Sequence, residues 1–171
     1  MTPDSVPGRF AYNEDHEAFR QTVRSFLQKE GVPNVNEWEQ NRLVPKDFWR
    51  KAGEIGMLCP TVPEAYGGLG LDFGYNAIVD EEMSYIGVPA GFSLQSDIVC
   101  GYLEAYGSEE QKAQWLPRLV SGETITAIAM TEPGTGSDLQ AIRTSAKKDG
   151  NHYVVNGSKT YITNGQNADL V

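Results

Sequence analysis

The sequence predicts an α+β protein in which helices come first and strands follow. Between residues 13 and 122, apolar residues recur every three or four positions, which is the period of an amphipathic helix. From residue 123 onward, short β-branched and alternating segments appear, and Asp149-Gly150 is a strong hairpin signal. We therefore expect an all-helical N-terminal domain over residues 1–122 and the first part of an antiparallel β domain over residues 123–171.

Local start and stop signals place the helices of the first domain. They are expected at residues 13–30, 45–56, 75–86, 91–106 and 108–121. Asn13 is a suitable N-cap for the first helix, and Gly31 with Pro33 should end it. Ser108 and Gln111 form a capping box for the last helix, which Pro117 is expected to kink or interrupt.

Three segments of the second domain read as strands. They are the apolar run "TITAIAM" at 124–130, the hairpin "RTSAKKDGNHYVVNG" at 143–157 and "SKTYITNG" at 158–165. So few strands leave open sheet edges, which natural proteins avoid. We therefore expect the β domain to be incomplete within this sequence.

Composition excludes some classes of function. The chain has 171 residues, of which 40 % are hydrophobic, so it can bury a core. Its net charge is −9, and a strongly acidic chain repels the phosphate backbone of nucleic acids. Nucleic acid is therefore not expected as a partner.

The rare residues and the chain start favour a reduced, cytoplasmic setting. Cys59 and Cys100 are far apart and are expected to be reduced thiols in the core. His16 and His152 lack the spacing of a metal site, so no metal is expected. No run approaches the roughly 18 apolar residues of a membrane span, and residues 1–13 lack the pattern of a signal or transit peptide.

The stretch "MTEPGTGSDL", residues 130–139, is the first candidate for a binding site. Thr131 and Ser137 supply hydroxyl groups, while Gly134 and Gly136 would let a ligand reach backbone N–H groups. The stretch has neither the lysine of a phosphate-binding P-loop nor the Gly-x-Gly-x-x-Gly spacing of a dinucleotide fold. Taken alone, it is better explained by an ordinary turn than by a ligand site.

A second segment, "NGSKTYITNG" at 156–165, strengthens the case for a ligand. On a strand, Tyr161 and Thr163 would share one face. An aromatic ring beside a hydroxyl group is suited to stack on a flat heteroaromatic ligand and to bond its edge. The alternative is a half-buried Tyr and Thr on a sheet face.

Four segments together resemble the acyl-CoA dehydrogenase family. They are "VPEAYGGLG" (62–70), "GSEEQKAQWLPRLVSGE" (107–123), "AMTEPGTGSDL" (129–139) and "NGSKTYITNG" (156–165), in the order and spacing of that family. The stretches "AGFSLQSDIV" (90–99) and "AMTEPGTGSDLQAIRTSAKKDG" are most similar to its long-chain branch. The resemblance covers nearly the whole chain.

The resemblance implies a fold and a reaction. The fold would comprise a helical N-terminal domain, a middle β domain and a C-terminal helical bundle that this sequence lacks. FAD would bind between the middle and C-terminal domains, often within a homotetramer. The reaction would be α,β-dehydrogenation of an acyl-CoA thioester in fatty-acid β-oxidation. A base would remove the α-proton, the β-hydrogen would pass to flavin N5 as a hydride, and an electron-transfer flavoprotein would take the electrons.

By position, the resemblance also assigns cofactor contacts. They are Ile128, Met130, Thr131, Gly136, Ser137, Tyr161, Ile162 and Thr163. The Met130 backbone and the Thr131 hydroxyl would meet the pyrimidine end of the flavin, while Gly136 and Ser137 would contact the pyrophosphate. Tyr161, which replaces a Trp of many members, would pack on the isoalloxazine ring, and Thr163 would donate to N5.

The acyl-CoA substrate is assigned a smaller set of residues. Ser137 would touch the CoA portion, and Leu94, Gln95 and Ile98 would line the acyl cavity. For these last three residues, an ordinary place in a helix core explains the sequence equally well.

No catalytic base is expected in this sequence. Glu132 lies in the flavin motif, but its neighbours there favour a local structural role. The run Asp80-Glu81-Glu82 is expected to be a solvated or helix-packing face. In the family the catalytic Glu belongs to the C-terminal domain, so we expect the 171-residue chain alone to be inactive. A related flavoprotein oxidase on the same fold and a non-catalytic helical interaction module remain the alternatives.

Overall fold

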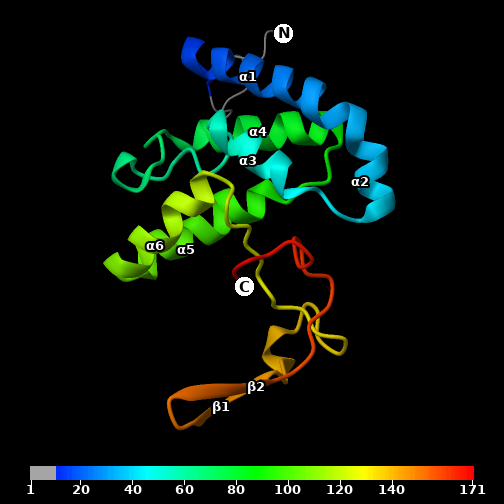
Figure 1. Ribbon diagram of the computed structural model, residues 1–171, viewed down its shortest axis with the longest axis vertical. Coiled ribbons are helices and arrows are strands. Elements are labelled where there is room, and N and C mark those ends of the chain that lie inside the picture. The colour runs from blue at the N-terminus through cyan, green and yellow to red at the C-terminus, as the bar shows by residue number, and fades with distance from the viewer. Residues whose placement is uncertain (1–10) are drawn as a thin grey trace.

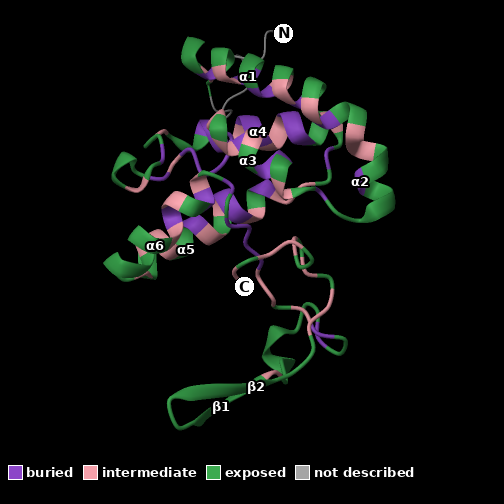
Figure 2. Ribbon diagram, viewed as in Figure 1, coloured by how far each residue is buried: buried purple, intermediate pink, exposed green. Residues whose placement is uncertain are grey.

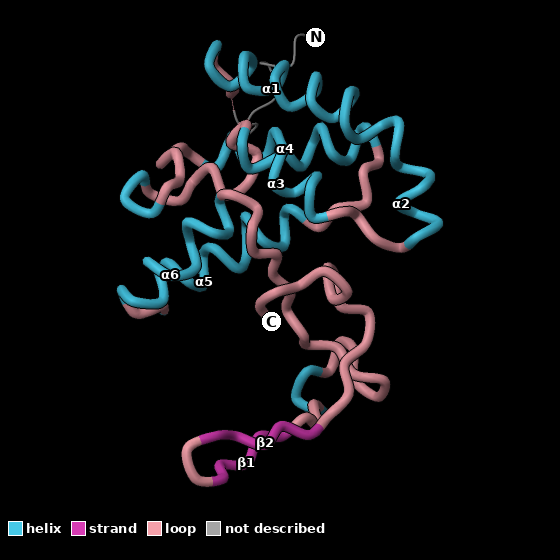
Figure 3. The backbone as a smooth tube through the Cα atoms, in the orientation of Figure 1, coloured by secondary structure: helices cyan, strands magenta, loops and turns pink. Residues whose placement is uncertain are grey.

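The computed structural model describes residues 11–171 and shows a helical body with an extended arm (Figures 1 and 3). The body contains the helices up to residue 122. The arm, residues 123–171, leaves the body, runs out to a β-hairpin and returns, so that the C-terminus lies between hairpin and body. The α+β class and the order of its two parts are confirmed. Residues 1–10, part of the predicted first domain, lie outside the described residues.

Helix α1 (Glu14–Phe26) begins at the predicted cap and packs on α4 (Phe73–Ile86). The Asn13 side chain accepts the His16 N–H, and the His16 ring accepts the Asn13 N–H, which closes a capping box. Helix α1 ends at Phe26, before the predicted stop at Gly31. The chain then continues through a π-helical turn (Leu27–Gly31) and a 3₁₀ turn (Val32–Asn34) into α2 (Val35–Asn41), a helix that the sequence did not predict.

The remaining helices follow the predicted order. They are α3 (Lys46–Glu54), α5 (Cys100–Tyr106), which continues a π-helical turn over Leu94–Val99, and α6 (Glu109–Val120). Ser108 and Gln111 form the expected capping box, and α6 continues through Pro117 to Val120. Among residues 11–171, none of the helices combines the length and apolar character that a bilayer span requires.

The core lies between these helices (Figure 2). Its largest fully buried side chain is Trp49 of α3, which meets the edge of Phe92 at 4.5 Å between ring centroids. Cys59 and Cys100 are free thiols in this core, with their sulfur atoms 2.9 Å apart. The backbone of α3 at Gly53 lies close to the backbone at Ser121. A Cβ added to Gly53 would be only 2.6 Å from the Ser121 carbonyl. This contact packs α3 tightly against the chain that leaves α6.

The β-hairpin forms a two-stranded antiparallel sheet in the described part of the chain. Strands β1 (Ser145–Asp149) and β2 (His152–Asn156) pair antiparallel, with Asp149 opposite His152. Gly150 has φ +58°, as the predicted tight turn requires. Every residue of both strands is exposed, so the hairpin buries neither of its faces (Figure 2).

Two of the expected strands were wrong. Residues 124–130 run extended, but they pair only through a bridge between Thr126 and Leu170. Side chains take the place of a neighbouring strand there, since Gln95 accepts the Thr126 N–H and Asp169 accepts the Ile125 N–H. Residues 158–165 are not a strand either, because Tyr161 has φ +55° and breaks the extended course.

Candidate functional site

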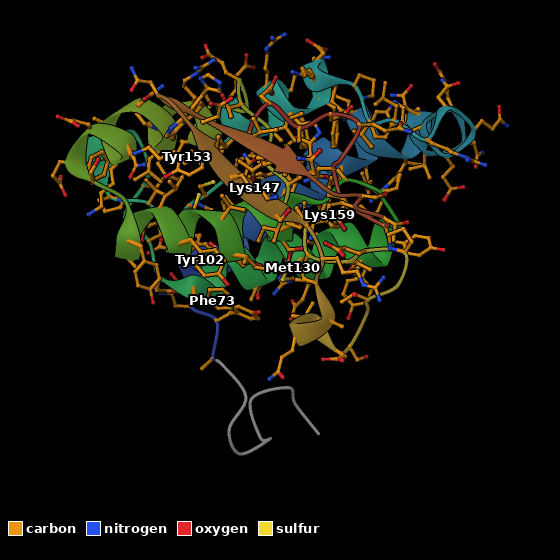
Figure 4. All side chains as sticks on the ribbon, turned by 90° about the horizontal axis from the view of Figure 1, so that it is seen from below. Phe73, Tyr102, Met130, Lys147, Tyr153 and Lys159 are labelled. Atoms are coloured by element: carbon orange, nitrogen blue, oxygen red, sulfur yellow. The ribbon has the colours of Figure 1, made fainter. Side chains whose placement is uncertain are left out.

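The two predicted motifs lie side by side at the base of the arm. Lys159 Nζ donates to the Met130 carbonyl at 2.9 Å, and Thr160 N–H donates to the Thr131 carbonyl at 3.0 Å. Figure 4 shows Lys159 next to Met130, with Lys147 and Tyr153 farther out along the hairpin. The fold therefore joins the segments that the sequence had linked only through the family resemblance.

The loop over residues 130–137 is closed by its own backbone. Glu132 and Thr135 exchange both N–H···O bonds at 3.0 Å, which makes Pro133-Gly134 a tight turn. The Thr135 hydroxyl donates to the Ala141 carbonyl at 3.0 Å. These bonds fix the loop while leaving its outer face exposed.

Glu132 holds this loop to the base of the hairpin. Its carboxylate accepts the Arg143 N–H at 2.8 Å, the Thr144 N–H at 2.9 Å and the Thr144 hydroxyl at 2.5 Å. Lys159 Nζ adds an ion pair at 3.0 Å. The Thr144 hydroxyl above all, followed by the two backbone N–H groups, lowers the pKa of Glu132 to about 2. These bonds agree with the expected structural role and occupy the group that could have been mistaken for a base.

The outer face of the loop presents unused hydrogen-bond donors. Among residues 11–171, no acceptor is bonded to the N–H groups of Met130, Thr131, Gly136 or Ser137. Gly136 and Ser137 are exposed, Thr131 and Ile128 are half-buried, and a Cβ on Gly136 would meet no other described atom within 4 Å. This donor set and the open space suit an anionic ligand that approaches the backbone.

A flat, partly apolar surface accompanies these donors. The Tyr161 side chain is 92 % exposed and Met130 is 50 % exposed. Neither side chain contributes to the core, so both are available to cover an aromatic ring. The unbonded N–H groups and the exposed aromatic side chain are the kinds of group that an anionic ligand with a flat ring requires.

Ile162 and Thr163 do not extend this surface as a strand would. A Cβ added to Gly91 would lie 2.5 Å from the Thr163 methyl group, so Thr163, although exposed, lies against the helical body at Gly91. Ile162 lines a pocket of about 420 Å³ next to α2 and α3, together with Trp38 and Trp49. The expectation that Tyr161 and Thr163 share a strand face was wrong, because Tyr161 adopts a left-handed backbone conformation.

The three residues expected to line the acyl cavity differ from one another. Gln95 is fully buried, where its Nε2 donates to the Leu119 carbonyl at 2.9 Å and its Oε1 accepts the Thr126 N–H at 3.0 Å. These bonds favour the alternative role of Gln95 in the helix core. Leu94 is half-buried and Ile98 is 45 % exposed, so these two keep apolar surface for a ligand.

The acidic residues Asp80 and Glu82 of α4 face different partners: Glu82 pairs with arginines of α1, and Asp80 lies beside Asp97. Glu82 is buried and pairs at 2.7 Å with Arg24 and at 3.1 Å with Arg20, which confirms helix packing for this residue. Asp80 lies beside Asp97, and burial together with that carboxyl raises the pKa of Asp80 to about 7. No local pattern indicates this pair of carboxyl groups, since Asp80 and Asp97 belong to different helical segments. Within residues 11–171, no cluster of His, Cys, Asp and Glu could hold a metal ion.

Comparison with known proteins identifies the family. Residues 13–123 match the model of the acyl-CoA dehydrogenase N-terminal domain, and residues 127–171 match that of the middle domain. The long-chain specific acyl-CoA dehydrogenase, mitochondrial, of Sus scrofa is 48 % identical over 164 residues. That alignment covers 95 % of this chain and 38 % of the relative, so the chain spans less than half of the relative's length.

Solved structures lead to the same family. An acyl-CoA dehydrogenase from Geobacillus kaustophilus matches with a TM-score of 0.90 and 53 % identity, over 94 % of this chain and 43 % of that one. A glutaryl-CoA dehydrogenase from Mycobacterium smegmatis in complex with FADH2 matches with a TM-score of 0.83 and 33 % identity, over 92 % and 41 % of the two chains. With both domain models matched along almost all of its described length, the chain belongs to the acyl-CoA dehydrogenase family.

Proposed function

We propose that this chain supplies the N-terminal domain and the start of the middle domain of an FAD-dependent acyl-CoA dehydrogenase. The parent protein would catalyse α,β-dehydrogenation of acyl-CoA thioesters in fatty-acid β-oxidation. Family membership and the FADH2 complex of the Mycobacterium smegmatis relative support this proposal. The observation on which it chiefly depends is the contact between the motifs at 130–137 and 159–163, which joins a loop that has unbonded N–H groups to a segment that carries the exposed Tyr161 ring.

Within this proposal, each residue of the site has a task. The Met130 N–H and the Thr131 hydroxyl would hold the pyrimidine end of the flavin, and Ile128 would lie along the same stretch. The N–H groups of Gly136 and Ser137 would bind the pyrophosphate. When bound, FAD would supply the acceptor for the hydride that leaves the β-carbon.

The second motif would complete the contacts to the ring. Tyr161 would cover the isoalloxazine with its exposed side chain, while Ile162 and Thr163 would border it on the side of the helical body. Ser137 would also touch the CoA portion of the substrate. Leu94 and Ile98 would meet the acyl chain with the apolar surface that they leave uncovered.

No carboxylate of the described site is free to act as the base. Glu132 is engaged by four donor groups and stays ionised, so it is a poor acceptor for an α-proton. We therefore propose that the base lies outside this sequence and that the 171-residue chain is inactive by itself. Turnover of an acyl-CoA by the isolated chain, followed with an artificial electron acceptor, would contradict this part of the proposal.

Replacement of Tyr161 tests the ring contact. Because the side chain is 92 % exposed, Tyr161→Ala should leave folding nearly unchanged and weaken FAD binding by about 5- to 10-fold. Tyr153→Ala is the matched control, since Tyr153 is 66 % exposed on the hairpin and away from the loop. Titration with FAD followed by flavin fluorescence measures both affinities.

The outcomes separate the role of Tyr161 from the function itself. Equal affinities of the two variants would contradict the ring contact while leaving the function in place. A gene product that is purified without flavin, and that takes up none when FAD is added, would contradict the proposed function.

The proposal also includes partners and a location. An electron-transfer flavoprotein would take the electrons, and the assembled state would be a homotetramer, which light scattering of the gene product tests. A cytoplasmic location is kept as an expectation. Cell fractionation with an antibody to the chain would decide it.

A further inference from the structure

Lys159 occupies a position that none of the assigned contacts explains. Its side chain is only 21 % exposed, although lysine is normally solvated. Nζ reaches the Met130 carbonyl at 2.9 Å and Glu132 Oε1 at 3.0 Å, so the ammonium group bridges a backbone oxygen and a carboxylate. The positive charge is therefore held inside the candidate site and directed at one peptide group.

Glu132 fixes this charge in place. The carboxylate is bonded to Arg143 N–H, Thr144 N–H and the Thr144 hydroxyl, all at the start of the hairpin, and it is 7 % exposed. Because three other donors hold the Glu132 carboxylate in one position, the ion pair restrains Lys159 to that position as well. The ammonium group consequently has one preferred place, between Glu132 and the Met130 carbonyl.

The geometry of the peptide bond gives this contact a consequence. The Met130 carbonyl belongs to the same peptide group as the Thr131 N–H, and no peptide bond among residues 11–171 is cis. In a trans peptide, the C=O and N–H bonds point in opposite directions, so the Thr131 N–H points away from Lys159. That N–H is one of the donors with no bonded acceptor among residues 11–171.

A cation on the carbonyl strengthens the donor on the other side. Hydrogen bonds in series polarise one another, and a charged donor polarises its acceptor more strongly than a neutral one. The Thr131 N–H should thus bind an anionic acceptor more tightly than a neutral one. Reduced flavin carries more negative charge at its pyrimidine end than oxidised flavin, so a polarised donor there would favour the reduced form.

We propose that Lys159 is a positioning residue for the cofactor, which orients the Met130–Thr131 peptide and polarises its N–H toward the pyrimidine end of the flavin. This inference rests on the proposed function. It adds the Thr131 N–H to the Met130 N–H and the Thr131 hydroxyl proposed above, and it names the residue that sets the strength of this added donor.

Three variants test the inference in the gene product loaded with FAD. Lys159→Met removes the charge and retains length, Lys159→Arg retains the charge, and Lys147→Met is the control on the exposed hairpin. In the Lys159→Met variant, binding of reduced FAD should weaken about tenfold relative to oxidised FAD, because one charged hydrogen bond is lost. This change makes the two-electron midpoint potential about 30 mV more negative. Lys159→Arg should recover most of the shift, and Lys147→Met should show none.

A second measurement needs no cofactor. Amide hydrogen exchange of the peptide spanning residues 128–138 in the flavin-free chain should be about tenfold faster in Lys159→Met than in the unaltered chain or in Lys147→Met, because the loop loses one of its ties. Circular dichroism confirms that each variant is folded.

The two measurements distinguish the possible failures. A Lys159→Met protein that retains FAD with an unchanged potential would overturn the inference and leave the proposed function standing. Unchanged exchange of residues 128–138 would also overturn it. If the unaltered protein bound no FAD, the proposed function would fail together with the role toward the cofactor, and faster exchange would then assign Lys159 to loop structure alone.

Discussion

At the scale of single residues, the motif around Glu132 shows what a sequence can and cannot predict. Glycines and hydroxyl groups indicated a loop that a ligand could approach, and the exposed N–H groups of Gly136 and Ser137 agree with that interpretation. The donors that surround Glu132 come from residues 143, 144 and 159, which follow it by 11 to 27 positions. Separations of this kind depend on the fold, so no local pattern could have named Lys159 as its partner.

The depressed pKa of Glu132 predicts how stability depends on pH. The Thr144 hydroxyl and two backbone N–H groups lower the folded-state pKa to about 2, while an unfolded Glu has a value of about 4.3. The carboxylate therefore stabilises the fold fully above about pH 4.3, and this contribution is lost as the pH falls toward 2. Urea unfolding of the unaltered chain and of Glu132→Gln should show a difference in unfolding free energy that is constant from pH 7 to 5.

Below pH 5 that difference should shrink, because a protonated Glu resembles Gln. Glu123→Gln, in an exposed and loosely paired position, is the control and should track the unaltered chain throughout. A difference for Glu132→Gln that stays the same down to pH 2 would contradict the assignment of the low pKa to this carboxylate.

At the scale of elements, the features that were predicted correctly depend on residues that lie close together in the sequence. The capping boxes at Asn13 and Ser108 were readable because a cap and its partner lie three residues apart. The hairpin was readable from Asp149-Gly150 for the same reason. Helix α2 was missed because Gly31 and Pro33 are stop signals, whereas the chain turns there through π and 3₁₀ geometry and starts a new helix.

Replacement of glycine by alanine should have opposite effects at two helical positions, because only one of them lies against a neighbouring backbone. Gly53→Ala places a Cβ 2.6 Å from the Ser121 backbone, which cannot yield easily, so it should destabilise the chain by about 1–3 kcal/mol. Gly101→Ala, in α5, meets no described atom within 4 Å and should stabilise it by about 0.5–1 kcal/mol through helix propensity. Urea unfolding measures both, and a loss of stability in Gly101→Ala as large as that in Gly53→Ala would contradict the packing argument.

At the scale of the whole molecule, the body and the arm differ in how they are held. The body buries a continuous apolar core between its helices, whereas both strands of the hairpin are exposed (Figure 2). The strands expected at 124–130 and 158–165 were wrong, because a sequence pattern does not supply the neighbouring strand that pairing requires. Within the first of these segments, Thr126 pairs with Leu170 through one isolated β-bridge.

This difference predicts where a protease cuts first. Isolated two-stranded hairpins are only marginally stable, so limited trypsin digestion should begin at Lys147 and Lys148 of β1. Lysines of the body, such as Lys51 on α3, should be cut later. Mass spectrometry of the early fragments identifies the first cleavage sites, and a stable product that contains the helices should accumulate. Early cleavage at Lys51 would contradict it.

The hydrogen bonds of Glu132 at the base of the hairpin have a practical consequence for protein engineering. Its attachment lies entirely at the base, where Glu132 holds Arg143, Thr144 and Lys159, while the turn at Gly150 projects beyond it. Extra residues at that turn would lengthen a free end without disturbing the attachment. The tip is therefore a suitable place to insert an epitope or a fluorescent label, which could report on the loop over residues 130–137 from a distance without touching it.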